Sequence, residues 1–375
     1  MKAKKVAVAV LAAVMAYGAF QVAHRQAPTQ EVESAPLYPQ LLEQMNDARK
    51  LTIALPGERI SIVRTGEGWG LADRDNFPVA GGLVKELLMQ VAGFRIREAK
   101  TSKPELYASL GVEDLSADKA ASRQITVLDA KEQPLVDLVV GKERKAKGAD
   151  SPGYFVRRAG EAGAWLVTGD LTLKTKRNDW LDTNIVNVPV ERVRQSSLLA
   201  DGHPPVVVAK ASPKEQLFTL QNIPTGQEPK SVALVSNVGG VLLDLRFDDV
   251  AAASRVAGLT PQRTAVVETF DGLVATLKLY EVEGKRWASL GFEHRANVEA
   301  AAQPTAEATK TPGVDGNQAS GKETKAPDVA TEVRQLNEKT AAWVYQLPDY
   351  KLRTLDKQLS DLTKPKDTRP PPPAQ

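Results

Sequence analysis

The chain has 375 residues, and 42% of them are hydrophobic, so it is long enough to form two domains with a core in each. Its 49 basic and 46 acidic side chains leave a net charge of +3, which is too weak to indicate a nucleic-acid-binding protein. The sequence contains no cysteine, which excludes disulfides, thiolate nucleophiles, thiolate zinc sites and lipid attachment through an N-terminal cysteine.

The N-terminus has the pattern of an export signal. Three lysines lie among the first five residues, and the run from Val6 to Phe20 contains no charged side chain. No small-x-small cleavage site follows this run. Residues 1–23 are therefore predicted to be an uncleaved signal anchor that forms a transmembrane helix, with a removable signal peptide as the alternative. The lysine flank predicts a cytoplasmic N-terminus and a single pass through a bacterial inner membrane, with the bulk of the chain in the periplasm beyond a polar stalk at residues 24–36.

Residues 37–198 have the pattern of a first α+β unit. A lead-in helix is predicted over residues 41–48, and alternating apolar and polar residues over 51–71 predict short antiparallel strands. A longer helix is predicted over residues 83–92, because apolar residues recur there with helical spacing and Gly93 follows.

The remainder of this unit is predicted to return to strands. A strand is predicted over residues 94–100, and Ser102 with Glu105 forms a capping box for a short helix that ends at Gly111. Two pairs of antiparallel strands are then predicted over residues 123–141 and 153–167.

Residues 199–362 repeat the same order of elements, which indicates a second, related unit. The predicted helix, strand and short helix lie at residues 231–240, 241–247 and 248–258, and further strands lie over 263–290. Gly258 corresponds to Gly111 (258 − 111 = 147), and Val241 corresponds to Phe94 (241 − 94 = 147). The predicted fold class is therefore α+β: an N-terminal transmembrane helix, then two tandem related units, each a twisted antiparallel sheet with covering helices.

A low-complexity tract interrupts the second unit. Residues 296–330 contain no aromatic and few large apolar side chains, so they are predicted to be a disordered insertion in a loop. The chain then continues with Trp343, which we interpret as the counterpart of Trp180 (343 − 180 = 163). Residues 363–375 are predicted to be a Pro-rich tail.

No constellation for catalysis or metal binding is evident. His24, His203 and His294 are not within metal-ligand spacing of one another, so each is interpreted as a solvated side chain. The glycines at 81 and 82 precede a predicted helix without the lysine of a phosphate-binding loop, and no serine lies in a G-x-S-x-G turn.

The carboxylates gather in two places. Asp179 and Asp182 lie around Trp180, and a second group consists of Asp244, Asp248 and Asp249. With Arg177 and Arg246 nearby, both groups are interpreted as ionised loop or helix caps, and a cation site at the first group is the alternative.

The other candidates are also interpreted as structural. The five tryptophans (Trp69, Trp165, Trp180, Trp287 and Trp343) are predicted to be core anchors. The basic residues Lys142, Arg144, Lys145 and Lys147 are predicted to form a solvated loop. No catalytic, cofactor-binding or metal-ligating residue is predicted, no cofactor is implied, and the chain is not expected to be an enzyme.

The run from Gly68 to Asp114, followed by "VVGK", "YFVRR" and "WLDTNIVNV", resembles the membrane-anchored bacterial family known as domain of unknown function 4340. The resemblance is close over residues 37–194 and weaker over 206–362. It implies an envelope protein that is often associated with gliding-type ABC transporter components as an auxiliary subunit, and it supplies no catalytic residue.

These observations favour a non-enzymatic periplasmic accessory or interaction protein of an inner-membrane complex, with an ABC-type permease as the expected partner and no nucleic acid. The alternative is a sensory module that binds an envelope glycan or peptide between the two units, with Trp69 or Trp165 exposed. An envelope hydrolase is the third hypothesis, which no nucleophile, base or metal constellation supports.

Overall fold

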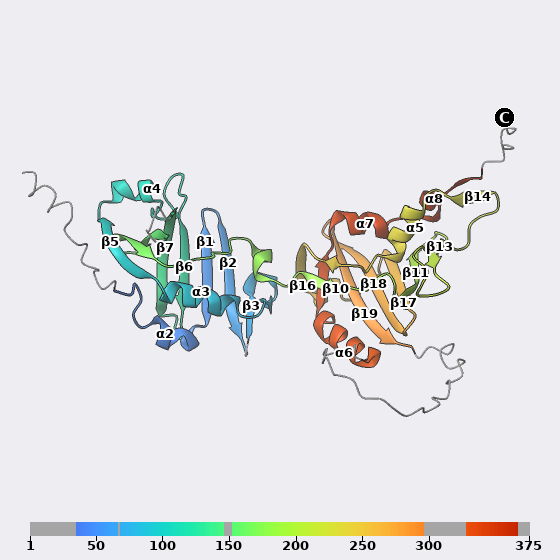
Figure 1. Cartoon of the computed structure of the whole chain (residues 1–375), viewed down its shortest axis with the longest axis horizontal. Coiled ribbons are helices and arrows are strands. Elements are labelled where there is room, and N and C mark those ends of the chain that lie inside the picture. The colour runs from blue at the N-terminus through green and yellow to red at the C-terminus, as the bar shows by residue number, and fades with distance from the viewer. Residues whose placement is uncertain (1–34, 67, 146–151, 296–327, 367–375) are drawn as a thin grey trace, which may run out of the picture. The chain divides into compact units, whose positions relative to one another are not determined.

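The computed structural model describes residues 35–66, 68–145, 152–295 and 328–366 (Figure 1). Within these ranges, no helix is both long and apolar enough to cross a membrane. The predicted anchor at residues 1–23 lies outside the described residues, as do residues 24–34 of the stalk, 296–327 of the insertion and 367–375 of the tail.

The chain divides into two compact units. The first comprises Met1–Ser61 and Gly82–Thr175, and the second comprises Ile62–Gly81 and Lys176–Gln375. The sequence places the boundary at Leu198 instead. The difference arises because Leu198 lies in the middle of a strand that pairs with Val206 on one side and with Ala265 on the other, so it belongs to the second sheet.

The first sheet has nine strands in the order β4-β3-β2-β1-β6-β7-β8-β9-β5. Their bounds are β1 Lys50–Leu55, β2 Glu58–Thr65, β3 Gly68–Leu71, β4 Phe77–Pro78, β5 Arg95–Thr101, β6 Arg123–Leu128, β7 Pro134–Arg144, β8 Gly153–Arg158 and β9 Ala164–Thr168. The helices of this part are α2 Leu41–Gln44, η1 Met45–Asp47, η2 Ala72–Arg74, α3 Leu83–Ala92, η3 Pro104–Leu106 and α4 Tyr107–Leu110. The strands alternate as expected: in β1, Leu51 and Ile53 are fully buried, whereas Lys50 is exposed.

The second sheet has eight strands in the order β13-β12-β11-β17-β18-β19-β20-β16. Their bounds are β11 Val193–Ala200, β12 Val206–Ala209, β13 Thr219–Leu220, β16 Asp249–Ala252, β17 Arg263–Thr269, β18 Leu273–Val282, β19 Lys285–His294 and β20 Trp343–Gln346. Two short ribbons pair β10 Asn184–Val186 with β15 Leu245–Arg246, and β14 Gln227–Pro229 with β21 Thr363–Pro365. The helices are η4 Arg177–Trp180, α5 Val232–Gly239, η5 Ala253–Val256, α6 Val329–Thr340, α7 Asp349–Leu355 and α8 Leu359–Leu362.

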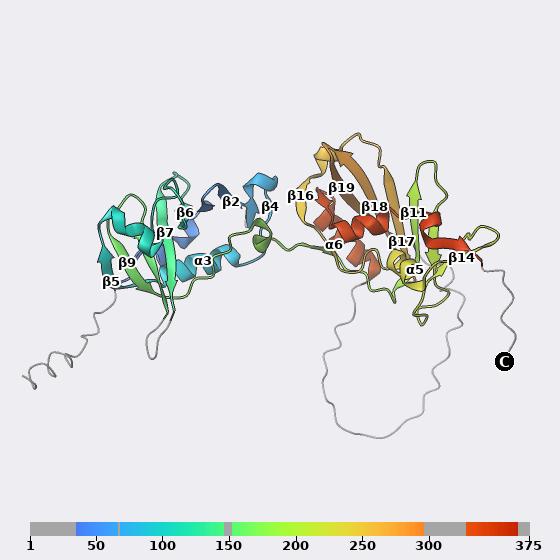
Figure 2. The same ribbon diagram turned by 90° about the horizontal axis from the view of Figure 1, so that it is seen from above.

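Helix α6 lies beside β19 in both views (Figures 1 and 2). The side chain of Asn337 accepts a hydrogen bond from the backbone N–H of Phe292 (3.0 Å) and donates one to the carbonyl oxygen of the same residue (2.8 Å). An amide side chain thus satisfies the two backbone groups that a neighbouring strand would otherwise pair with.

Both sheets are antiparallel and carry a few helices, so the predicted α+β class is confirmed. The two sheets also share their strand order. The strands β11 to β13 correspond in chain order to β1 to β3, and β16 to β20 correspond to β5 to β9. With this matching, the second sheet has the same order as the first, except that β4 has no counterpart.

This strand order corrects the interpretation of Trp343. It lies in β20, which occupies the position of β9 in the first sheet, and β9 carries Trp165. The offset is 178 residues (343 − 165 = 178), which exceeds the usual 147 by about the length of the inserted tract. Trp180 lies instead in η4, so the predicted match between Trp180 and Trp343 is wrong.

Several local predictions are also corrected. Residues 241–244 form a turn, and only Leu245–Arg246 of the predicted strand is extended. Asp249 begins β16 instead of capping a helix, and the short helix η5 follows it. The predicted capping box is absent, because η3 has no side-chain cap hydrogen bond. The helix α6 and the strand β21 begin inside the predicted insertion and tail.

Candidate functional site

The segment Ile62–Gly81 is built into the core of the second unit through Phe77. The ring of Phe77 meets Phe247 edge-on, with centroids 5.4 Å apart, and meets Trp343 in the same way at 4.8 Å. Phe247 in turn lies 5.4 Å from Tyr345. Edge-to-face pairs add about 0.5 to 1.5 kcal/mol each to the burial of the rings, so Phe77 is an anchor for this segment.

The turn between β3 and β4 has a backbone that its sequence explains. Asp75 and Asn76 both have positive φ angles (54° and 61°), which short polar side chains tolerate better than other residues do. Gly70 faces this turn, and a Cβ there would lie 2.6 Å from the carbonyl oxygen of Asn76. The residues at 70, 75 and 76 therefore shape the loop that presents the neighbouring charged side chains.

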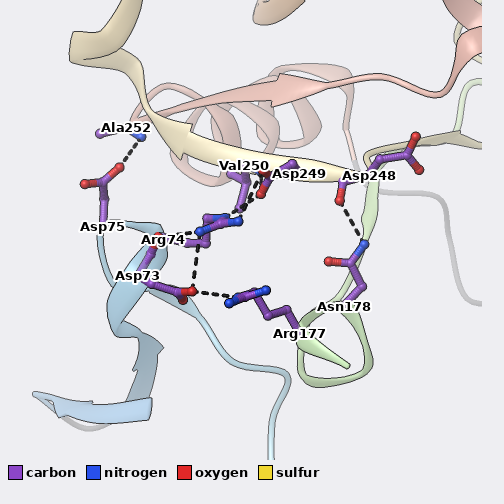
Figure 3. Close-up of polar contacts among 9 residues, drawn as sticks. All are labelled: Asp73, Arg74, Asp75, Arg177, Asn178, Asp248, Asp249, Val250 and Ala252. Atoms are coloured by element: carbon purple, nitrogen blue, oxygen red, sulfur yellow. Dashed lines mark hydrogen bonds and ion pairs between the residues drawn. The ribbon is translucent and has the colours of Figure 1, made fainter. Parts of the chain in front are cut away.

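Two side chains of this turn hold the strand β16 (Figure 3). Arg74 donates hydrogen bonds from Nε and Nη2 to the two carboxylate oxygens of Asp249, at 2.5 and 3.3 Å. Asp75 accepts a hydrogen bond from the backbone N–H of Ala252 (2.8 Å). These contacts satisfy polar groups at both ends of an edge strand, and the two-point arginine–carboxylate geometry also fixes its orientation.

The helix η4 approaches the same turn from the other side (Figure 3). Arg177 donates from Nε to the carboxylate of Asp73 (2.6 Å), and the Asn178 side chain donates to the carbonyl oxygen of Asp248 (2.9 Å). The backbone N–H of Ala80 also donates to the carbonyl oxygen of Trp180 (2.8 Å). Residues 73–75, 177–178 and 248–252 thus form one polar cluster, which we call the turn cluster.

The turn cluster contains Asp248 and Asp249 of the second predicted carboxylate group, but neither Asp179 nor Asp182 of the first. Asp249 pairs with Arg74, a partner 175 positions away that the sequence did not indicate. Arg246 pairs with Asp244 of the same predicted group (3.0 Å), as expected. The alternative of a cation site finds no support here, since no group of three or more metal-ligating side chains occurs among the described residues.

Of the other carboxylates, Asp182 accepts a hydrogen bond from the Asn184 backbone N–H and lies 3.5 Å from Lys339 Nζ. Asp179 and Asp248 are both exposed. These side chains act as loop caps or solvated charges, which agrees with the sequence-based interpretation.

The remaining predicted candidates are scattered over the fold. His203 and His294 are exposed, and His24 and Lys147 lie outside the described residues. The predicted basic loop is corrected in part, because Lys142 and Arg144 lie in the last residues of β7. Lys142 donates to the carbonyl oxygen of Ser109 (2.8 Å), at the C-terminal end of α4, where a cation is favourable. Gly82 takes a positive φ angle (83°) directly before α3.

The tryptophans differ in exposure. Trp180 and Trp287 are buried, which confirms the prediction of core anchors for these two residues. Trp69, Trp165 and Trp343 are half-buried. Arg64 lies over the ring of Trp69 at 5.5 Å, and Arg158 lies over that of Trp165 at 5.4 Å.

A hollow of about 720 Å³ lies between α5 and α7 in the second unit. Lys351 is only 6% exposed. Its Nζ donates to the carbonyl oxygens of Leu243 (2.7 Å), Val241 (2.9 Å) and Gly240 (3.4 Å), just beyond the C-terminal end of α5. Burial lowers the pKa of Lys351 to about 8, and the negative charge of Asp244 partly offsets this effect. Lys351 is the functional-site candidate that sequence reasoning missed, because its partners are backbone groups more than a hundred residues away.

A second hollow, of about 550 Å³, lies against α3 in the first unit. Its lining includes Gln90 and Gly93, and the lining of the α5–α7 hollow includes their counterparts Asn237 and Gly240 (237 − 90 = 147; 240 − 93 = 147). Each unit therefore carries a hollow against one of its helices, α3 in the first and α5 in the second, with corresponding residues in the two linings.

The fold and these surfaces define an α+β protein with two antiparallel sheets and open hollows. The model of one protein family, described as domain of unknown function (DUF4340), matches residues 69–263, which is more than half of the chain. The chain belongs to this family. The match begins at Trp69 in β3 and ends at the start of β17, so it extends further into the second sheet than the close part of the resemblance in the sequence. No curated protein matches the chain.

Proposed function

We propose that the protein is a non-enzymatic interaction module, an accessory subunit of a bacterial inner-membrane complex. In this proposal residues 1–23 anchor the chain in the membrane with the N-terminus in the cytoplasm, and the two sheets lie in the periplasm. The resemblance to membrane-anchored envelope proteins suggests an ABC-type transporter as the complex. No cofactor is required for this role.

The observation that carries the proposal is the pair of hollows at corresponding positions of the two sheets. Each hollow has exposed apolar atoms in its lining: Met89 is 53% exposed in the first, and Tyr350 is 51% exposed in the second. Apolar side chains grouped with polar ones in a concave surface are typical of binding sites. Two such sites on one tethered chain raise the effective concentration of the second contact once the first has formed.

The matching strand order also supports an origin by duplication. We propose that the two sheets with their helices are tandem related units, because eight strands have the same order and corresponding glycines lie 147 residues apart. Duplication explains why each unit carries its own hollow.

The experiment is copurification of the full-length protein from membranes in mild detergent, with chemical crosslinking. We expect a permease to copurify. Replacing Met89 and Tyr350 together by glutamate is expected to reduce its recovery, because a charge in each hollow opposes the burial of apolar surface. The control is Leu42→Glu, since Leu42 is 62% exposed on α2 and lines neither hollow. Recovery of the protein alone under all crosslinking conditions would refute the proposal.

The alternative of a glycan-binding module depends on the faces of Trp69 and Trp165. One face of each ring is covered by an arginine side chain, Arg64 or Arg158, which reduces the aromatic surface available for stacking on a sugar. The interaction module is therefore the function that the described surface supports better.

A further inference from the structure

The hollow between α5 and α7 has an excess of positive charge. Three basic residues line it, namely Lys351, Arg353 and Lys357, and its lining contains one acidic residue, Asp244. Asp244 is already paired with Arg246, whose Nε lies 3.0 Å from the Asp244 carboxylate. Lys351 directs its hydrogen bonds to three backbone carbonyl oxygens. The charge of the lining is therefore not balanced from within the hollow.

Arg353 and Lys357 are the cations that a ligand can reach. Arg353 lies in the last turn of α7, and Lys357 follows shortly after the helix ends at Leu355. Both side chains line the hollow. Neither forms an ion pair with a carboxylate in the part of the chain that the structure describes. The carboxylate between them in sequence, Asp356, is used elsewhere: it receives two hydrogen bonds from Arg286, both at 2.7 Å.

Apolar surface lies beside these cations. Tyr350 is 51% exposed and Leu243 is 43% exposed, and both line the hollow. Exposed apolar side chains in a concave surface of this size usually mark a binding site, where a ligand covers them. The combination of two unpaired cations with an aromatic and an aliphatic side chain matches a peptide that carries both carboxylates and apolar groups.

The corresponding hollow of the first unit has the opposite charge. Its ionisable lining residues are Lys85, Glu86 and Asp170, so acidic residues outnumber basic ones by two to one. The two hollows occupy corresponding places but differ in the charge of the ligand that they would attract.

From this charge and shape we propose that the α5–α7 hollow binds an acidic segment of the partner protein. The carboxylates of the segment pair with Arg353 and Lys357, and its apolar side chains pack against Tyr350 and Leu243. This inference rests on the proposed interaction function and names the chemistry of the partner segment at one of the two hollows.

The test is isothermal titration calorimetry of the full-length protein in detergent with two capped peptides, Ac-Glu-Leu-Asp-Phe-amide and its neutral counterpart Ac-Gln-Leu-Asn-Phe-amide. The acidic peptide is expected to bind about 2-fold to 30-fold more tightly, since two exposed ion pairs contribute about 0.2 to 1 kcal/mol each. The double substitution Arg353→Gln with Lys357→Gln is expected to remove that preference. Arg353 is exposed, Lys357 is half-buried, and neither makes an ion pair with a carboxylate among the described residues, so the variant is expected to fold.

Lys85→Gln is the matched control, because it removes one cation from the other hollow and is expected to leave the preference unchanged. Equal binding of the two peptides, or a preference that survives the double substitution, would overturn the inference. Inorganic phosphate that competes as well as the acidic peptide would also overturn it, because it would indicate a general anion site. If the permease copurifies with the double variant as with the unaltered protein, the interaction function stands and the assignment of this hollow falls.

Discussion

Replacing Lys351 by methionine is expected to change how the stability of the protein depends on pH. Burial lowers the pKa of Lys351 from 10.5 to about 8 in the folded protein. The unfolded chain therefore binds this proton more tightly than the folded chain does. Between pH 8 and 10.5 the unfolded state holds more protons, so the contribution of Lys351 to the free energy of unfolding rises with pH. Below pH 8 both states are protonated, and the dependence disappears.

The magnitude follows from the pKa difference. Each unit corresponds to about 1.4 kcal/mol, so the full effect is about 3 kcal/mol. About 2 kcal/mol of it falls between pH 7 and 9.5, because the lysine of the unfolded chain, with a pKa of 10.5, is still mostly protonated at pH 9.5. The methionine variant lacks this ionisable group. We therefore expect the free energy of unfolding of the protein, minus that of the variant, to increase by about 2 kcal/mol from pH 7 to pH 9.5.

Equilibrium unfolding in guanidinium chloride at the two pH values, followed by circular dichroism, measures this difference. The control is Arg353→Met on the same helix, because arginine stays protonated throughout this pH range and its loss leaves Lys351 in place. The free energies of unfolding of the protein and of the Lys351→Met variant could instead differ by the same amount at both pH values. This result would show that the ammonium group is solvated in the folded state. The reasoning about the hollow would then be wrong.

Three pairs of substitutions test the packing and the turn cluster, each by the midpoint of guanidinium unfolding. Phe77→Ala is expected to cost about 3 kcal/mol and Phe77→Leu about 1 kcal/mol, since the ring is 7% exposed and contacts two other rings. Asp249→Asn is expected to cost about 1 kcal/mol by weakening its pairing with arginine, whereas Asp248→Asn, on an exposed side chain, should change stability by less than about 0.5 kcal/mol. Gly141→Ala in β7 is expected to cost about 1 to 3 kcal/mol, because the new Cβ would collide with a backbone oxygen of α4, while Gly291→Ala in β19, where nothing lies within 4 Å, should be nearly neutral. Equal effects of the matched members of any of these pairs would contradict the packing described above.

The elements that the sequence predicted well are those whose signal is local. The helical spacing over 83–92 and Gly93 correspond to α3 and its C-terminal cap. The alternation around residues 123–141 and 153–167 corresponds to the four strands β6 to β9. In each case the period of the apolar residues lies within one segment, and the neighbouring element follows directly in the chain.

The elements that the sequence missed depend on distant partners. Residues 241–247 are apolar enough to resemble a strand, but Leu245 pairs only with the short strand β10, and the residues before it turn beneath Lys351. Residues 249–252 became the strand β16 because β20, nearly a hundred residues later, supplies its hydrogen bonds. Tertiary pairing overrides the local preference in both segments.

The candidate sites were less predictable from the sequence than the helices and strands. The pairing of Arg74 with Asp249 joins residues 175 positions apart, and neither residue type is unusual on a protein surface. The α5–α7 hollow is built from a helix end, a turn and a later helix, so its charge excess is not visible in any single stretch of the chain. The constant offset of 147 between Gly111 and Gly258 and between Phe94 and Val241 indicated that the two halves are related, but it did not indicate a hollow in either.

The contact of Asn337 with β19 has a consequence for how copies of this protein behave when crowded. An unpaired strand edge offers a ready template to the edge of another molecule and so promotes aggregation. At Phe292 both backbone groups are already engaged by the side chain of α6, which leaves that position closed to a foreign strand. The helix α6 thus prevents a strand of another molecule from pairing with β19 at this position.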